Sequence, residues 1–203
     1  MRTISLKNNN TRALLVKNAI ELFKENGTAS VSVKDICDRA AVTRNAFYYY
    51  FESKELMFDA VGDWVSETSK ERITVISGEA SYYRRLWEIY HAYLKTQIEV
   101  GPDIMNHVCF SRTMKERSDT YSYIDEELAE TMIGLIRKAQ ETGQILNPSP
   151  AEKLLWTSYA LVRGVNIKWC FQWGESDLIG ETMESLNDIF LPAEGYALTE
   201  ADR

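Results

Sequence analysis

Three residues that favour helix N-termini follow one another closely in the first third of the chain. Ser32, Thr43 and Ser53 each precede a short run of residues with apolar groups at helical spacing. Asp35, three residues after Ser32, completes the pattern of a capping box. Because each cap begins a new helix, the segment between the first and third caps must hold two short helices joined by a tight turn. This arrangement is a helix-turn-helix.

The second short helix, predicted to run from residue 44 to about residue 50, carries three consecutive tyrosines. Adjacent residues of a helix point about 100° apart, so the three rings cannot share one core. We expect Ala46, Phe47 and Tyr50 to face inward. The outward side then offers a cation, an amide and two phenols, which are Arg44, Asn45, Tyr48 and Tyr49. These groups suit base edges and phosphates, so the pattern predicts a surface that binds double-stranded DNA.

The rest of the chain shows helical periodicity and no convincing strand alternation, so we expect an all-α protein. Further helices are predicted at 11–26, 53–76, 81–100, 103–115, 121–141, 149–173 and 177–191, with glycine or proline near several ends. We expect the tail after Pro192 to be mobile. The predicted domains are an N-terminal three-helix, helix-turn-helix DNA-binding domain at 1–52 and a larger helical bundle for effector binding and dimerisation at 53–203.

Charge is divided unevenly between these two parts. Residues 1–60 hold nine Lys and Arg against seven Asp and Glu, and residues 61–203 hold fourteen against twenty-three. The parts therefore carry +2 and −9, which sum to the net charge of −7, and we expect them to meet different partners. The three cysteines are far apart in the sequence, and no apolar run approaches the roughly 18 residues of a membrane span. We expect a cytoplasmic protein without a membrane partner.

A candidate ligand site lies in the helices predicted at 81–100 and 103–115. Aromatic and apolar side chains with a few polar tips suit a small apolar or aromatic molecule. Ordinary core packing is the alternative for each of these side chains. The residues predicted to line the site are Trp87, His91, Leu94, Met105, Cys109 and Phe110.

The last two predicted helices indicate self-association. In the first of them apolar residues lie on nearly every face, so the helix needs covering on more than one side. Two such helices from each of two chains could form a four-helix interface around a two-fold axis. Burial within a single chain is the alternative. The predicted dimer interface consists of Trp156, Tyr159, Ile179, Met183, Leu186 and Phe190.

The stretch LVKNAIELF followed by Gly27, and then SVKDICDRAAVTRNAFYYYFESKEL, resembles the DNA-binding region of TetR-type transcriptional regulators. The resemblance covers about residues 11–60. It implies a ligand-responsive repressor that binds an inverted-repeat operator as a homodimer and is released by a small-molecule effector. The family usually has Gly where this chain has Ala41, and Ala where it has Cys37. A left-handed backbone costs Ala about 1 kcal/mol more than Gly, so Ala41 is expected to strain the turn.

The same resemblance implies roles for individual residues. Positions that commonly touch phosphates in such proteins match Thr43, Tyr48, Tyr50 and Lys54, and positions that approach bases match Arg44, Asn45 and Tyr49. Lys54 is also placed for phosphate by its position in the first turn of a helix, where the helix dipole is positive. We add Ser32, at the start of the other short helix, to the predicted DNA contacts.

Enzymatic motifs are absent from the sequence. The chain contains no glycine-rich phosphate loop, no HExxH, no paired CxxC and no GxSxG elbow. Its two histidines, His91 and His107, lack a second metal ligand at convincing spacing, so we expect neither a metal nor a cofactor. We therefore expect no enzyme. The alternative is a helical small-molecule-binding or catalytic protein that does not regulate transcription.

Overall fold

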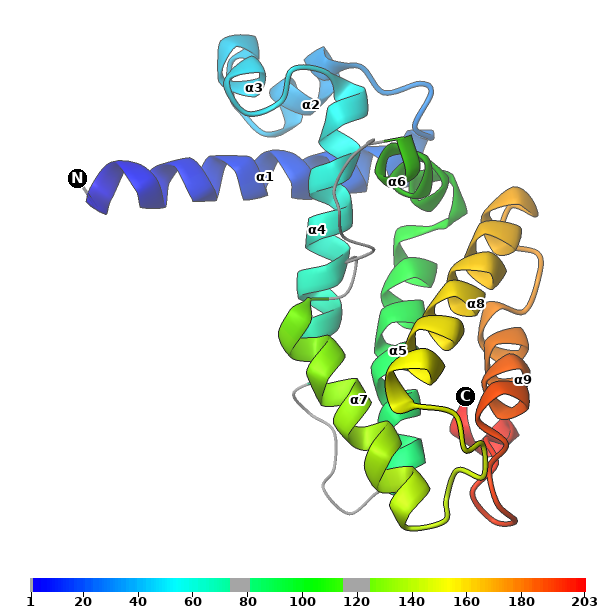
Figure 1. The fold of residues 1–203 in the computed structure, drawn as a ribbon. Coiled ribbons are helices and arrows are strands. Elements are labelled where there is room, and N and C mark those ends of the chain that lie inside the picture. The colour runs from blue at the N-terminus through cyan, green and yellow to red at the C-terminus, as the bar shows by residue number, and fades with distance from the viewer. Residues whose placement is uncertain (1, 74–80, 115–124) are drawn as a thin grey trace. The chain divides into compact units, whose positions relative to one another are not determined.

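The computed structural model describes residues 2–73, 81–114 and 125–203 (Figure 1). Within these ranges the regular elements are helices, which confirms the all-α fold with an N-terminal helix-turn-helix. No helix in them is long and apolar enough to cross a membrane. The helices are α1 Arg2–Asn26, α2 Val33–Arg39, α3 Arg44–Tyr50, α4 Lys54–Ile73, α5 Tyr82–Val100, α6 Pro102–Met114, α7 Glu126–Glu141, α8 Ala151–Phe171, α9 Leu178–Phe190 and the 3-10 helix η1 Glu200–Asp202.

Most helix bounds lie within a few residues of those predicted from periodicity and caps. The first helix begins earlier, at Arg2 rather than residue 11. It ends as predicted, because Gly27 takes a φ of +78° and its amide donates to the Phe23 carbonyl oxygen at 2.8 Å. The predicted start of the helix before Glu141 falls on residues 121–124, which lie outside the described ranges.

The chain divides into two compact units. One consists of Met1–Glu67 and Gln97–Glu116, and the other of Thr68–Thr96 and Arg117–Arg203. The first unit therefore holds α1 to α3, most of α4 and α6. The second holds most of α5 together with α7, α8 and α9. The domain boundary expected at residue 52 falls inside the first unit.

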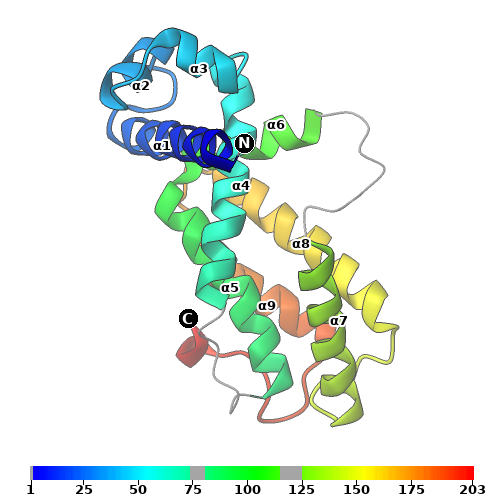
Figure 2. The same cartoon turned by 90° about the vertical axis from the view of Figure 1, so that its left-hand side faces the viewer.

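The core of the first unit forms where α2 and α4 pack against α1. Leu15, Ala19 and Phe23 recur on one side of α1 and are buried. The Phe23 ring stacks on Phe58 of α4 with ring centroids 5.2 Å apart. In both views α2 and α3 lie next to each other beside α1 (Figures 1 and 2). Burial of this apolar face fixes α2 and, through it, α3.

In the second unit, α8 packs against both α7 and α9. Buried polar pairs fix the packing of α5 on α8 and α9. The Tyr83 hydroxyl donates to Asn187 Oδ1 on α9 at 3.1 Å, and the hydroxyls of Tyr90 and Ser158 on α8 lie 2.7 Å apart. Burial raises the pKa of both tyrosines far above the usual value, so both phenols stay neutral.

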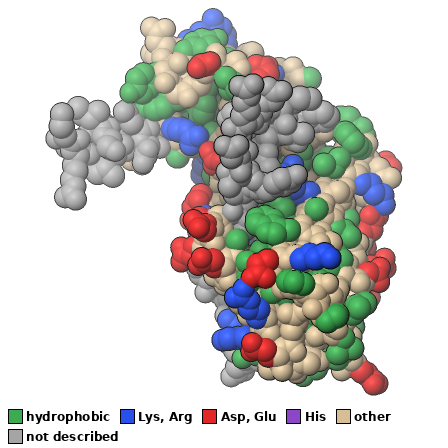
Figure 3. Space-filling model, in the orientation of Figure 1, with side chains coloured by type: hydrophobic (Ala, Val, Ile, Leu, Met, Phe, Trp, Pro, Cys, Tyr) green, Lys and Arg blue, Asp and Glu red, His purple; other side chains and the backbone are tan. Residues whose placement is uncertain are grey.

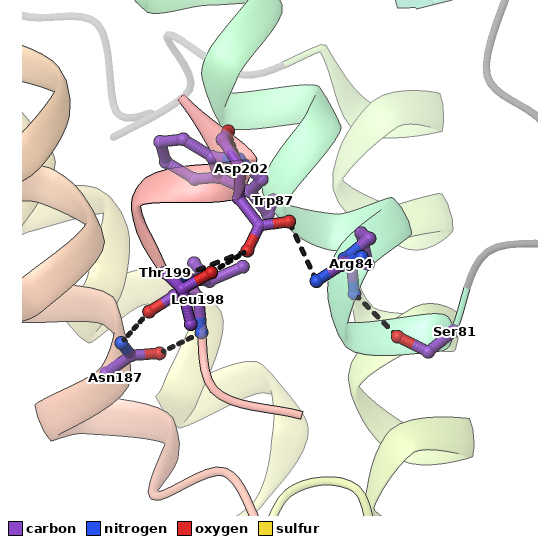
Figure 4. Close-up of polar contacts among 7 residues, drawn as sticks. All are labelled: Ser81, Arg84, Trp87, Asn187, Leu198, Thr199 and Asp202. Atoms are coloured by element: carbon purple, nitrogen blue, oxygen red, sulfur yellow. Dashed lines mark hydrogen bonds and ion pairs between the residues drawn. The ribbon is translucent and has the colours of Figure 1, made fainter. Parts of the chain in front are cut away.

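The segment that follows α9 is held in place, so the prediction of a mobile tail after Pro192 is wrong for its last residues. Leu198 is buried. The Leu198 amide donates to Asn187 Oδ1 at 3.0 Å, and Asn187 Nδ2 donates to the Leu198 carbonyl oxygen at 2.9 Å. Four residues on, Asp202 contacts α5 (Figure 4). These contacts join parts of the sequence that no local pattern relates.

Candidate DNA-binding surface

A complete capping box begins α2. The Ser32 hydroxyl donates to the Asp35 carboxylate at 2.6 Å, and the Ser32 amide donates to the same oxygen at 2.8 Å. The Asp35 amide in turn donates to the Ser32 hydroxyl oxygen at 3.3 Å. These hydrogen bonds from Ser32 hold the pKa of Asp35 below its usual value. Ser32 therefore fixes the start of α2, and its contact with DNA stays a prediction.

The turn between α2 and α3 bends at Ala41, whose φ is +53°. The Val42 amide donates to the Cys37 carbonyl oxygen at 3.0 Å, which closes the turn. Alanine thus occupies a left-handed position that favours glycine. Cys37 is buried below the turn, with its thiol 3.8 Å from the Thr43 carbonyl oxygen. Burial raises the pKa of this thiol, so Cys37 behaves as a small apolar side chain.

Phe47 holds α3 in the orientation that the sequence predicts. Its ring is fully buried and packs against the Phe51 ring, with centroids 5.5 Å apart. Thr43 caps the helix, its hydroxyl accepting from the Ala46 amide at 3.2 Å. With Phe47 inward, Tyr48 and Tyr49 are 54% and 71% exposed. The four outward residues share one exposed surface, the α3 face, which is Arg44, Asn45, Tyr48 and Tyr49.

Tyr50 lies at the edge of the α3 face. Its side chain is half-buried, as expected for a ring that packs inward with its hydroxyl near the boundary. The rings of Tyr49 and Tyr50 meet edge to face, with centroids 4.9 Å apart. This contact restricts Tyr49, whose ring is otherwise in solvent. A preordered Tyr49 loses less conformational freedom when it meets DNA.

The cations of α2 and α3 differ in how far they are already paired. Lys34 lies 2.5 Å from the Asp38 carboxylate, and Arg39 makes two hydrogen bonds to Glu25, at 2.6 and 2.7 Å. Pairing with these carboxylates raises the pKa of both cations. Arg44 is exposed and makes no ion pair within the described ranges. Its guanidinium therefore keeps its donors for a phosphate or a guanine edge.

Lys54 is placed less simply than the sequence indicates. Its ammonium donates to the carbonyl oxygens of Thr28 and Val31, both at 3.0 Å, and the side chain is half-buried. Lys54 thereby ties the loop between α1 and α2 to the first turn of α4. One of the three ammonium hydrogens remains for a phosphate. The predicted phosphate contact stays a prediction beside this structural role.

The same loop is joined to α6 through the Thr28 joint, which consists of Thr28, Asp103 and His107. The Thr28 amide and hydroxyl donate to the two oxygens of Asp103 at 2.7 and 2.9 Å. The hydroxyl oxygen also lies 3.0 Å from His107 Nε2. Because the Thr28 hydroxyl hydrogen is used on Asp103, His107 Nε2 is the donor in this contact. The His107 ring stacks on Phe58 of α4 with centroids 4.5 Å apart.

The residues predicted to line a ligand site belong to both units. Trp87 and Leu94 are buried on α5, and the Trp87 indole stacks on the His91 ring with centroids 5.1 Å apart. On α6, Met105 is buried and Cys109 half-buried. The side chain of Phe110 lies outside what the structure describes. The single site that the sequence predicts therefore stays a prediction, with its two halves on α5 and α6.

The residues predicted to form a dimer interface separate into two kinds. Met183, Leu186 and Phe190 are buried within the chain itself. Trp156 is 40% exposed, and Tyr159 and Ile179 are partly exposed. The Trp156 and Tyr159 rings meet edge to face on the surface of α8. On the face in Figure 3, hydrophobic side chains lie among acidic and basic ones over the second unit.

Sequence reasoning missed the Thr28 joint and the contact of Asp202 with α5. Thr28 and Asp103 are 75 residues apart, and Trp87 and Asp202 are 115 apart, so neither pair leaves a local pattern. A weak signal existed at Thr199, because a threonine followed by an acidic residue three positions later resembles a capping box. The structure contains this box at η1.

Similarity to known proteins agrees with the geometry. Residues 15–61 match the family model described as bacterial regulatory proteins, tetR family. The HTH-type transcriptional regulator TtgR of Pseudomonas putida is 23% identical over 84% of this chain and 85% of its own length. The probable acrEF/envCD operon repressor of Escherichia coli is 37% identical over 29% of this chain and 26% of its own length.

Two solved structures share the fold. One is the Thermus thermophilus FadR, a TetR family transcriptional repressor in complex with lauroyl-CoA, with a TM-score of 0.64, 18% identity and coverage of 93% of this chain and 96% of that one. The other is SmeT, the repressor of the Stenotrophomonas maltophilia multidrug efflux pump SmeDEF, with a TM-score of 0.57, 16% identity and 95% coverage of both chains. The helix-turn-helix region of this chain is thus similar to that of tetR-family regulatory proteins, and its fold is shared with these two solved structures.

Proposed function

We propose that this protein is a dimeric repressor that binds an inverted-repeat operator and leaves it when a small effector binds. The main support for the proposal is the α3 face, because its residues are exposed, offer several kinds of polar group and lie on a helix that buried residues hold in place. Arg44 is unpaired among the described residues, Asn45 offers an amide, and Phe47 fixes the helix from the buried side. Such a face suits both phosphate contact and base readout in the major groove.

The two classes of contact predict different effects of substitution. A bidentate hydrogen bond from Asn45 to adenine would discriminate against another base by about 1–3 kcal/mol. A phosphate contact from Tyr48 would contribute equally to every sequence. The ammonium of Lys54 would act in the same way, although its loss also frees the loop at Thr28.

Dimerisation would set the spacing of two such faces. We place the interface on the exposed side of α8 and the start of α9, where Trp156, Tyr159 and Ile179 remain accessible in the single chain. An apolar aromatic side chain at such a surface is a usual centre of an interface. Met183 and Leu186, which are buried within the chain, would not contact the partner but would hold α9 in position. A two-fold axis would place two α3 faces on half-sites separated by one helical turn, about 34–36 Å, or more.

Release of DNA would follow from a shift between two populations. An effector that favours the released conformation lowers the fraction of dimers whose α3 faces match successive major grooves. A change from 1:99 to 99:1 requires a differential affinity of about 5.5 kcal/mol for the two conformations. An apolar or aromatic effector bound in the helices after α4 can reach such a differential by burying its surface in one conformation only.

The test begins with selection of bound sequences from a random duplex library. We expect an inverted repeat, with affinity that falls as salt rises. Asn45→Ala should relax the base preference at one position of each half-site by about 1–3 kcal/mol. Asn18→Ala is a matched control, because the Asn18 amide donates to Leu14 within α1 and lies outside the α3 face. An unchanged preference in Asn45→Ala would remove Asn45 from base readout, and failure to select any sequence would overturn the function.

A further inference from the structure

The residue at the end of η1 reproduces the polar features of a small acid. The Asp202 carboxylate accepts from the Arg84 guanidinium at 2.8 Å, and its side chain is only 5% exposed. The Asp202 carbonyl oxygen accepts from the Trp87 indole at 2.8 Å (Figure 4). In aspartate the carboxylate carbon and the carbonyl carbon are separated by two carbon atoms. The segment therefore presents α5 with a carboxylate and an acceptor in a 1,4-relationship.

The groups that receive Asp202 belong to a single rigid element. Arg84 and Trp87 lie three positions apart on α5 and so share one side of the helix. Trp87 is almost fully buried and is supported on its flat side by the His91 ring. The Arg84 backbone is fixed by Ser81, whose hydroxyl accepts from the Arg84 amide at 3.3 Å. The helix and the Trp87 indole would keep their positions if Asp202 were withdrawn, and the half-exposed Arg84 guanidinium would lose its carboxylate partner.

The segment that carries Asp202 is lightly attached by comparison. Residues 199–201 and Arg203 are exposed, and η1 is a single turn held by the contacts of Thr199 with Asp202 at its ends. Apart from ion pairs of Arg203 with Asp177 and Glu200, its anchors are Leu198 and Asp202. This exposed turn can open when the contacts of Asp202 and Arg203 break, while Leu198 stays in place. Leu198, held from both sides by Asn187, would be the pivot.

A polar atom without a partner lies beside this contact. His91 Nε2 is buried and has no hydrogen-bond partner in the described part of the chain. The His91 ring is the one that stacks on Trp87. A buried polar atom of this kind has hydrogen-bonding capacity that a bound molecule can satisfy. The neighbourhood of Trp87 thus offers a cation, an indole N–H and an imidazole nitrogen.

We propose that Arg84 and Trp87 form a recognition site for an organic acid, and that Asp202 is the internal occupant which the acid displaces. The class of ligand is an apolar or aromatic carboxylate with a carbonyl oxygen in the 1,4-position. Arg84 holds the carboxylate, Trp87 donates to the carbonyl oxygen, and the apolar body takes the space of η1. This inference rests on the proposed function, because it assigns the chemical class of the effector.

An internal occupant has a measurable consequence. A ligand that binds only when the segment is open has its affinity reduced by the fraction of chains that are open. Removing the Asp202 carboxylate should raise that fraction and tighten binding of the acid. Arg84 is 46% exposed, so water can solvate it when Asp202 is gone, and the variant should fold normally. If the contact between Asp202 and Arg84 served only to stabilise the fold, removing the Asp202 carboxylate would give no gain in affinity for the acid.

The experiment is isothermal titration calorimetry of the full chain with 4-oxo-4-phenylbutanoate. We expect the wild type to bind it, and Asp202→Ala to bind it about tenfold more tightly, as loss of a competing charge-assisted hydrogen bond predicts. Arg84→Met should lose the acid by at least about tenfold. Arg137→Met is the matched control, because Arg137 is an exposed cation of the same unit that pairs with Glu152. This variant should bind the keto acid with the affinity of the wild type.

Two analogues separate the two polar contacts. The methyl ester lacks the carboxylate, and 4-phenylbutanoate lacks the ketone, so both should bind more weakly than the keto acid. Equal or weaker binding by Asp202→Ala, folded as judged by circular dichroism, overturns the proposal, and so does an ester that binds as tightly as the acid. No DNA is present in these titrations. Loss of DNA binding in a separate assay would therefore count against the proposed function alone.

Discussion

Replacing Ala41 with glycine should stabilise the helix-turn-helix. The residue has a φ of +53°, where an L side chain costs about 1–2 kcal/mol. Glycine removes this cost but gives back about 0.5–1 kcal/mol, because it loses more conformational freedom on folding. The Ala41 methyl is exposed, so no buried contact is lost with it. The net gain should therefore lie between about 0 and 1.5 kcal/mol, with a midpoint of about 0.8 kcal/mol.

The neighbouring alanine provides a control with the opposite sign. Ala40 is buried and takes the ordinary right-handed helical conformation, with φ −77° and ψ −3°. Ala40→Gly should cost about 0.5–1 kcal/mol of backbone entropy and about 0.8 kcal/mol for the buried methyl. The same chemical change at adjacent residues should thus stabilise at one position and destabilise at the next.

Hydrogen exchange measured by mass spectrometry resolves the effect to this region. A gain of about 0.8 kcal/mol should slow exchange about fourfold in peptides that cover α2 and α3, provided that they exchange by a shared opening. The Val42 amide, bonded to the Cys37 carbonyl oxygen across the turn, is the most direct reporter. Faster exchange in Ala41→Gly, or the same sign of effect in both variants, would refute the assignment of strain to Ala41.

Three further predictions concern other parts of the chain. Lys54→Met should speed hydrogen exchange in the loop at Thr28 and weaken binding to all DNA sequences alike; unchanged exchange would show that its two carbonyl contacts do not hold the loop. Trp156→Glu should give a folded monomer in light scattering, whereas Met183→Glu should lower the stability of the chain because it buries an unpaired charge. A folded, dimeric Trp156→Glu would exclude the interface proposed on α8 and α9. Burial lowers the pKa of His91 below 6.5, so the unfolded chain binds more protons than the folded chain, and the free energy of unfolding falls as the pH drops through and below 6.5. The variant His91→Gln should reduce this pH dependence, measured by urea titrations at pH 5 and 7. An undiminished dependence would assign it to other groups.

Local chemistry accounts for what the sequence predicted well. The caps at Ser32 and Thr43 act within three residues, and the burial of Phe47 against the exposure of Tyr49 follows from the geometry of one helix turn. The left-handed turn at Ala41 follows from the resemblance to a family that has glycine there. The caps and the orientation of α3 depend on neighbours in the sequence, and the turn depends on the resemblance, so all of them can be predicted without the fold.

Features that depend on distant residues could not be predicted in this way. The stripe of Met183 and Leu186 has the same periodicity whether it packs within one chain or between two, and only the structure shows that it is buried by the chain's own helices. The role of Lys54 as an anchor depends on carbonyl oxygens 26 and 23 residues away. Asp202 appeared to belong to a polar tail because its partners on α5 share no pattern with it.

The Thr28 joint bears on how such a regulator can be cut and recombined. A chimera that joins residues 1–67 of this chain to the later helices of another regulator would keep Thr28 but lose Asp103 and His107. The Thr28 amide would then need a new acceptor from the host's α6, or water. Transplanting α6 together with the N-terminal helices would preserve the joint. During synthesis the same dependence holds, because the Thr28 amide and hydroxyl acquire their acceptor Asp103 only after 75 further residues have been added.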